Sequence, residues 1–211
     1  MCLEYLNKKA MKTFVEIIQN IYPLSDESIA LLLPHVRKTF YPKNTYVIKP
    51  EDFKKEYFFI KEGLLRVNIN ILDKEIILAF LSEKEYFPSS CVSFISEIHV
   101  FQTISISTVK DCVIYELNKK ILDILFWENI EIAYFMFNLI NICYVDSISG
   151  IIRNKCFTPT ERYKLVIQMF PEVFNNLSIN ETASFLGINN TSLSRIRKKI
   201  IEEERAKRKQ K

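Results

Sequence analysis

The side chains capable of catalysis in this 211-residue sequence are few and widely separated. His35 and His99 are the only histidines, no HExxH or GxSxG pattern occurs, and the five cysteines include no CxxC pair. A zinc site or an activated nucleophile needs such residues at short, fixed spacing. The three glycines, Gly63, Gly150 and Gly187, are too scattered for a dinucleotide fingerprint or a phosphate-binding loop. The sequence therefore predicts that the protein is not an enzyme and binds no metal or other cofactor.

Positive charge is concentrated in the last quarter of the chain. Residues 1–155 carry 18 Lys or Arg and 19 Asp or Glu, a net charge of −1, whereas residues 156–211 carry 11 and 6, a net charge of +5. This asymmetry predicts an anionic partner for the C-terminal segment, with a merely solvated basic tail as the alternative. The odd number of cysteines and the charged first residues favour a reduced, cytoplasmic location, in which the cysteines pack as small apolar side chains.

A specific pattern lies in this basic region, in the sequence INETASFLGINNTSLSRIRKKI at residues 179–200. A helix-turn-helix needs a small residue where its two helices cross, a glycine four residues later for the turn, and apolar side chains that hold the helices together. The residues expected to form this core are Ala183, Leu186, Gly187, Ile188, Leu193 and Ile196. Thr182 stands where an aliphatic residue is more usual.

The other side chains of the second helix are predicted to form its exposed face. They are Asn190, Thr191, Ser194, Arg195 and the run Arg197, Lys198 and Lys199. Hydrogen-bonding and cationic groups are what a reader of the DNA major groove needs. An ordinary helical hairpin with a polar surface is the alternative interpretation.

The elements that must position this segment begin with short helices and strands. Residues 3–20 have helical spacing, and a second helix is expected to begin at Ser25 and end by Pro34. From Val36 to Leu117, short runs rich in β-branched and aromatic residues predict seven or eight antiparallel strands, with the Glu62–Gly63 turn linking a hairpin. About eighty residues of short strands indicate a small barrel or jelly roll.

Residues 128–153 are predicted to form one long helix with a seven-residue apolar repeat, which is typical of a helix that pairs with a second copy. The residues of this seam are Ile130, Ala133, Phe137, Ile140, Tyr144, Ser147 and Ile151. Packing of the helix wholly against its own barrel is one alternative. A membrane span is disfavoured because Glu131, Asn138, Asn141 and Asp146 interrupt the apolar run.

Gly150 and residues 154–160 are expected to mark a hinge, after which Thr158 and Pro159 begin a new helix. The sequence thus predicts three parts. They are a β-roll with N-terminal helices at 1–127, a dimerisation helix and hinge at 128–155, and a helix-turn-helix domain with a basic tail at 156–211.

The segment PTERYKLVIQMFPEVFNNLSINETASFLGINNTSLSRIRKK resembles the C-terminal domain of the catabolite-activator and fumarate–nitrate-reduction regulator (Crp/Fnr) family, in its Bacteroidetes-type variant. The motifs YPKNTYVIKPED and EYFFIKEGLLRV resemble the cyclic-nucleotide-binding-like β-roll of the same family. The resemblance implies an α+β fold, a homodimer with a winged-helix-like DNA-binding domain, and transcriptional regulation, often through contact with RNA polymerase. Because only eleven residues follow Ile200, a two-stranded wing hardly fits, and we expect a charged tail instead.

The same resemblance assigns roles within the second helix of the motif. Arg195 matches the guanine-reading arginine of the family, and Asn190 and Thr191 occupy the other two base-reading positions. The residues expected at the DNA backbone are Asn189, Ser192, Ser194, Arg197, Lys198 and Lys199. The expected partners are double-stranded DNA with a near-palindromic operator and a second copy of the chain, and no membrane.

The effector pocket departs from the nucleotide-binding members of the family. Those members use a Gly-Glu pair and an Arg followed by Ser or Thr, and these positions fall here on Pro88, Ser89, Gln102 and Thr103. Since the cation that would face the cyclic phosphate is lost, we expect an effector other than cyclic AMP. Iron–sulfur sensing would need a cluster of N-terminal cysteines, of which only Cys2 is present. The alternative function is a ligand-sensing or scaffold protein of the same fold that no longer reads DNA.

Overall fold

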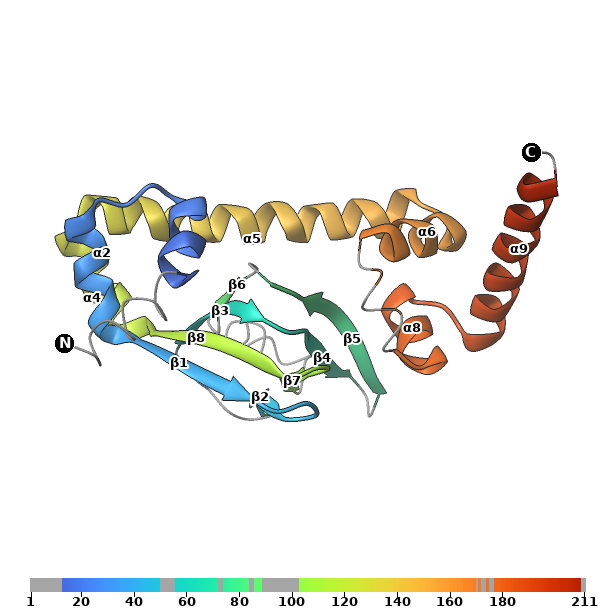
Figure 1. The fold of residues 1–211 in the computed structure, drawn as a ribbon, viewed down its shortest axis with the longest axis horizontal. Helices are drawn as coiled ribbons and strands as arrows, with labels where there is room; N and C mark the ends of the chain where they lie inside the picture. Colours follow the sequence, from blue (N-terminus) through green and yellow to red (C-terminus); the bar gives the residue numbers. More distant parts are fainter. Residues whose placement is uncertain are drawn as a thin grey trace.

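The computed structural model describes residues 13–49, 56–71, 74–83, 86–88, 103–169, 171, 174 and 177–209. A β-roll lies beside one long helix, and a group of shorter helices follows at the far end of that helix (Figure 1). Residues 13–21 are helical. The further helices are α2 (Asp26–Leu32), the 3-10 turn η1 (Leu33–His35), α4 (Lys119–Glu128), α5 (Ile130–Cys156), α6 (Pro159–Met169), α8 (Ile179–Leu186) and α9 (Asn190–Lys209). The strands are β1 (Val36–Tyr41), β2 (Tyr46–Ile48), β3 (Glu56–Glu62), β4 (Leu65–Ile71), β5 (Lys74–Leu81), β6 (Tyr86–Pro88), β7 (Thr103–Thr108) and β8 (Cys112–Asn118).

The described strands form two antiparallel sheets of four strands each, in the orders β1-β8-β3-β6 and β2-β7-β4-β5. Because side chains alternate along a strand, one face of each sheet can point into the roll. Ile60 and Ile114 of the first sheet and Val67 and Ile106 of the second are buried in one apolar cluster between the sheets. The β-roll predicted from the short strand-like runs is therefore confirmed.

The turn at Glu62 and Gly63 does not link a hairpin, so that part of the sequence-based expectation was wrong. Strand β3 pairs with β6 and β8, whereas β4 pairs with β5 and β7, so the chain crosses from one sheet to the other at this turn. Gly63 has a φ of 110°, and a Cβ there would lie 2.5 Å from the Asp111 carbonyl oxygen and from Cys112 Sγ. A crossing this tight needs a glycine for both reasons.

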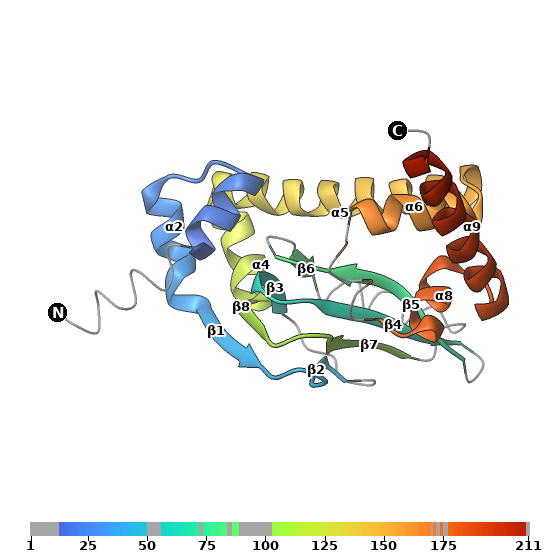
Figure 2. The same cartoon turned by 45° about the vertical axis from the view of Figure 1, so that its right-hand side comes forward.

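The outer face of the first sheet anchors the N-terminal half of α5. Tyr57 and Phe59 of β3 and Tyr115 of β8 are buried in one cluster with Phe135 of α5. Phe14, from the first described helix, contacts Phe59 edge-on with ring centroids 5.4 Å apart. This cluster fixes the direction of α5, and Figure 2 shows the helix running along the sheets toward the C-terminal helices.

Helix α5 continues through Gly150 to Cys156, so the expected hinge at Gly150 was wrong. A glycine inside a long helix lowers the stability of the helix by only about 1 kcal/mol relative to alanine, which is too little to end it. The chain bends at Phe157 and Thr158, within the expected segment 154–160, and α6 begins at Pro159 as expected. The Glu161 carboxylate accepts hydrogen bonds from the Thr158 backbone N–H and hydroxyl, both at 2.7 Å, which closes the first turn of α6.

A buried carboxylate ties the edge strand β1 to its neighbour β8. Glu116 is 2% exposed and accepts hydrogen bonds from the Arg37 guanidinium and from the Tyr41 hydroxyl. Burial opposes ionisation of Glu116, but the hydrogen bonds from Arg37 and Tyr41 outweigh it and lower the pKa of this carboxyl group. We assign this cluster a structural role, because each member is hydrogen-bonded within the sheet.

The cysteines differ in their surroundings. Cys112 is buried in the roll interior, where burial raises the pKa of its thiol to about 11. Cys156, at the end of α5, is exposed. The expectation that cysteines pack as small apolar side chains therefore holds for Cys112 and fails for Cys156.

Candidate nucleic-acid interface

The C-terminal helices α8 and α9 pack around a small apolar core that also includes Tyr163 and Val166 of α6. Every apolar residue expected to join α8 to α9 lies in this core: Ala183, Leu186, Ile188, Leu193 and Ile196. Gly187 ends α8 in the left-handed conformation, with φ of 64° and ψ of 35°, and its N–H donates to the carbonyl oxygens of Ala183 and Ser184. Helices α8 and α9 thus pack on one another through these side chains.

The start of α8 is fixed by a capping box, which the pattern S-x-x-E encodes but sequence reasoning did not use. Ser178 Oγ accepts from the Glu181 backbone N–H at 3.2 Å, and the Glu181 carboxylate accepts from the Ser178 N–H at 2.9 Å. The unusual Thr182 is fully buried, and its hydroxyl donates to the Ser178 carbonyl oxygen at 2.9 Å. A polar residue therefore fills this apolar position without leaving an unpaired group.

The side of α9 opposite this core faces solvent. Thr191, Arg195 and Lys198 recur at spacings of four and three residues and are all exposed, as are Ser194 and Lys199. Leu193 is fully buried and Ile196 is 8% exposed, so the helix cannot rotate without exposing its core residues. The structure thus presents a polar and cationic face on a firmly packed helix.

The remaining predicted contact residues have partners within the chain. Asn189 Oδ1 accepts from the Ser192 backbone N–H at 2.8 Å, which caps α9, and the Asn190 side-chain amide donates to Asn180. Arg197 is half-buried and donates from Nε to the Tyr163 hydroxyl at 3.1 Å. These three residues would have to exchange or share these contacts to reach DNA.

Arg162, which sequence reasoning did not identify, connects the end of α5 to the end of α8. Its guanidinium donates to the Phe157 carbonyl oxygen at 2.9 Å and to the Leu186 carbonyl oxygen at 3.0 Å. Carbonyl groups at helix C-termini lack helical partners and attract cations. Arg162 therefore holds α8 against the bend between α5 and α6.

The predicted seam of α5 is exposed along its length. Ile130, Phe137, Ile140, Tyr144 and Ile151 are between 55% and 68% exposed, Ala133 is half-buried and Ser147 is exposed. The residues of α5 that face the roll are others: Ile132, Phe135, Met136 and Leu139. The alternative in which α5 packs wholly against its own barrel is therefore wrong.

By length and composition, α5 is also the one helix in the described part of the chain that could cross a membrane. Only 17% of its most apolar window is buried. The apolar side chains of α5 that face solvent are therefore left uncovered by the described part of this single chain.

The expected effector positions are only partly described. Pro88 pairs with Tyr57 at the end of β6, and Thr103 pairs with Asn70 at the start of β7. Ser89 and Gln102 lie outside the described residues. Among the described residues no group of three or more His, Cys, Asp or Glu side chains could hold a metal ion.

Residues 38–129 match the model of the cyclic nucleotide-binding domain family, so this segment is similar to the members of that family. Most of the chain shares its fold with Crp/Fnr-family transcription regulators. No curated protein sequence matches the chain. Because the sequence identities to these solved structures are 17% or lower, the similarity establishes the fold alone.

The similar structures include CLP, a c-di-GMP responsive global regulator of Xanthomonas campestris, with 17% identity and a TM-score of 0.63 over 85% of this chain and 93% of CLP. A regulator from Eubacterium rectale assigned to the crp/fnr family has 16% identity and a TM-score of 0.66, over 87% of this chain and 88% of its own. FixK2 of Bradyrhizobium japonicum has 12% identity and a TM-score of 0.62, over 80% of this chain and 86% of FixK2.

Proposed function

We propose that the protein is a homodimeric, sequence-specific DNA-binding transcription regulator, in which α8 and α9 form a helix-turn-helix. The observation that carries this proposal is the exposed face of α9, where Thr191, Ser194, Arg195, Lys198 and Lys199 project from a helix held by its own apolar core. Side chains of these types on one helix face suit the donor and acceptor pattern of the major groove and the phosphates beside it. We refer to α9 below as the recognition helix.

The long helix supplies the second requirement of such a regulator. Two recognition helices must lie about 34 Å apart to enter successive major grooves on one side of DNA. A second copy packed on the exposed seam of α5 would produce a two-fold axis and therefore a near-palindromic operator. The two partners of this protein are then DNA and a second copy of itself.

The last residues support a role at the DNA backbone. The recognition helix continues without interruption to Lys209. Five of the seven residues from Arg205 to Lys211 are basic. We propose that this helical tail contributes phosphate contacts. A cytoplasmic location is a further part of the proposal and rests on the odd number of cysteines. Contact with RNA polymerase and the Bacteroidetes-type variant are also part of it and rest on the sequence resemblance.

Selection of bound sequences from a random pool of double-stranded DNA tests the proposed function. We expect the purified protein to enrich one near-palindromic sequence at moderate salt. Binding should weaken steeply as salt rises, because each phosphate contact contributes about −0.9 to the slope of log K against log salt concentration. Failure to enrich any sequence would contradict the proposal and favour a sensor or scaffold that no longer reads DNA.

We further propose that the effector is not cyclic AMP. The match to the cyclic nucleotide-binding domain describes the fold, whereas affinity for a cyclic phosphate needs the cation that Gln102 has replaced. A ligand present at 100 times its Kd stabilises the folded protein by about 2.7 kcal/mol, which is readily visible in a melting curve. We expect no change in Tm with millimolar cyclic AMP or cyclic GMP. A dose-dependent rise in Tm would show that another cation takes the place of the arginine.

A further inference from the structure

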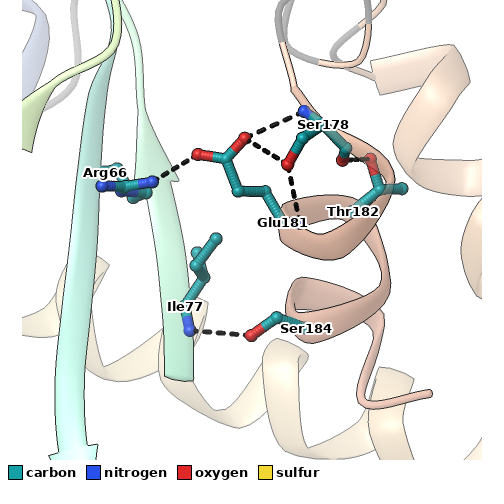
Figure 3. Close-up of polar contacts among 6 residues, drawn as sticks. All are labelled: Arg66, Ile77, Ser178, Glu181, Thr182 and Ser184. Carbon is teal, nitrogen blue, oxygen red and sulfur yellow. Dashed lines mark hydrogen bonds and ion pairs between the residues drawn. The ribbon is translucent and has the colours of Figure 1, made fainter. Parts of the chain in front are cut away.

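Helix α8 rests on the outer face of the β4–β5 hairpin, far from it in the sequence (Figures 1 and 3). Leu64, Ile77 and Phe80 are buried, and Phe174, Leu177 and Phe185 pack against them. The rings of Phe80 and Phe185 meet edge to face, with centroids 5.0 Å apart. An apolar contact thus joins the C-terminal helices to the β-roll.

Two polar contacts accompany this apolar cluster. Arg66 of β4 forms an ion pair with Glu181, whose other carboxylate oxygen closes the capping box of α8 with Ser178 (Figure 3). The backbone N–H of Ile77 donates to Ser184 Oγ at 3.4 Å. Only 24% of the Arg66 side chain and 32% of the Glu181 side chain are exposed, so water screens this pair less than it would screen a pair on the surface.

Strand β4 connects this contact to the interior of the roll. Leu65, Val67 and Ile69 are buried in the apolar cluster between the two sheets. Arg66 lies between them in sequence, and its side chain reaches the opposite face of the strand, where α8 lies (Figure 3). Strand β4 thus contacts the apolar cluster of the roll with one face and helix α8 with the other.

The contact uses α8 and leaves the recognition helix exposed. Glu181, Ser184 and Phe185 face the hairpin, whereas Thr191, Arg195 and Lys198 remain accessible to solvent. The docked arrangement is thus compatible with DNA binding. Because a dimer must present two recognition helices at a fixed spacing, fixing each one in advance lowers the entropy lost on binding.

We propose that Arg66 is a positioning residue, which holds α8 through Glu181 so that the recognition helix is pre-oriented for DNA. This inference rests on the proposed function. Arg66 touches no DNA in this proposal and acts through Glu181.

A double-mutant cycle with Arg66→Gln and Glu181→Gln tests this proposal on the full-length protein and the selected operator. Gln at position 181 can still close the capping box, because Glu and Gln both serve at this position, so the variant removes only the ion pair. We expect each single variant to weaken operator binding about tenfold and the double variant to be no worse, since contacting residues are not additive. Arg66→Lys should restore part of the affinity, because it keeps the charge.

Asp123→Asn provides a matched control, because it breaks the Lys119–Asp123 ion pair on α4 without touching α8 or the recognition helix. We expect this control to bind the operator within about twofold of the parent, as exposed pairs contribute little. Limited proteolysis without DNA reports docking directly. Cleavage at the bend formed by Phe157 and Thr158 should increase severalfold in the Arg66 and Glu181 variants and remain unchanged in the control.

Three results would overturn the proposal. Both single variants could show the same cleavage and the same operator affinity as the parent protein, or the losses of affinity in the double variant could be strictly additive. The single variants could also bind the operator more tightly than the parent, which would make the contact inhibitory. Failure of the proposed function has a different signature, because the parent protein itself would then select no operator. If cleavage still increased in the Arg66 and Glu181 variants, the docking of α8 on the β4–β5 hairpin would be supported. Only the role of this docking in DNA binding would then be lost.

Discussion

The variant that combines Phe137→Glu with Tyr144→Glu is expected to be monomeric and to lose operator binding. Both side chains lie on the exposed seam of α5, 59% and 63% exposed, so glutamate there should not disturb the fold of the single chain. In a dimer the four added carboxylates would be buried without partners, at a cost of several kcal/mol for each ion. The dimer should therefore dissociate at least about a thousandfold more readily, since each 1.4 kcal/mol is a factor of ten.

A control pair on the same helix makes this prediction specific to the seam. Ile142 and Ser149 are also exposed and also seven residues apart, but they lie on a different side of α5. We expect the variant that combines Ile142→Glu with Ser149→Glu to remain dimeric in light scattering. A seam variant that stays dimeric would refute the assignment of this surface.

The apolar character of α5 adds one further comparison. Its length and composition would also fit a membrane span. The fraction in which the unmodified protein is found after cell lysis without detergent therefore shows whether a second copy or lipid contacts the exposed apolar side chains. Recovery as a dimer in the soluble fraction agrees with a second copy on the seam. Recovery only in the membrane fraction, released by detergent, would instead identify lipid as the cover.

Features encoded by neighbouring residues were predictable from the sequence. Ser25 caps α2 as expected, Pro159 begins α6, and Gly187 adopts the left-handed turn between α8 and α9. The apolar core between α8 and α9 and the exposed seam of α5 also follow from spacing along single helices. In each case one or two turns of chain contain the whole signal.

Features that depend on distant partners were not predictable in this way. A short run followed by Gly63 looks the same whether the next strand joins the same sheet or the opposite one, so the crossover was mistaken for a hairpin. The ion pair between Arg66 and Glu181 joins residues 115 positions apart, and neither residue is unusual in its local sequence. The contact between the β-roll and α8 therefore became visible only when the folded chain brought strand β4 and helix α8 together.

Arg195→Ala is expected to weaken operator binding by about 1–3 kcal/mol and to relax the preference at one base pair of each half-site. Arg195 lies on the face of the recognition helix opposite Leu193, one turn beyond Thr191, where its forked guanidinium can pair with O6 and N7 of guanine. Asn190 and Thr191 occupy the other base-reading positions of our proposal. Binding to randomised operators measures affinity and base preference together.

Two comparisons separate base reading from simple attraction to phosphate. Arg195→Lys keeps the charge but loses the planar fork, so we expect it to lose base preference while keeping most of the salt dependence. Lys198→Ala should weaken binding to all sequences alike and reduce the salt slope by about one. If Arg195→Ala lowered affinity equally for every sequence, Arg195 would be a phosphate contact. The recognition helix would then enter the groove with a different face from the one proposed.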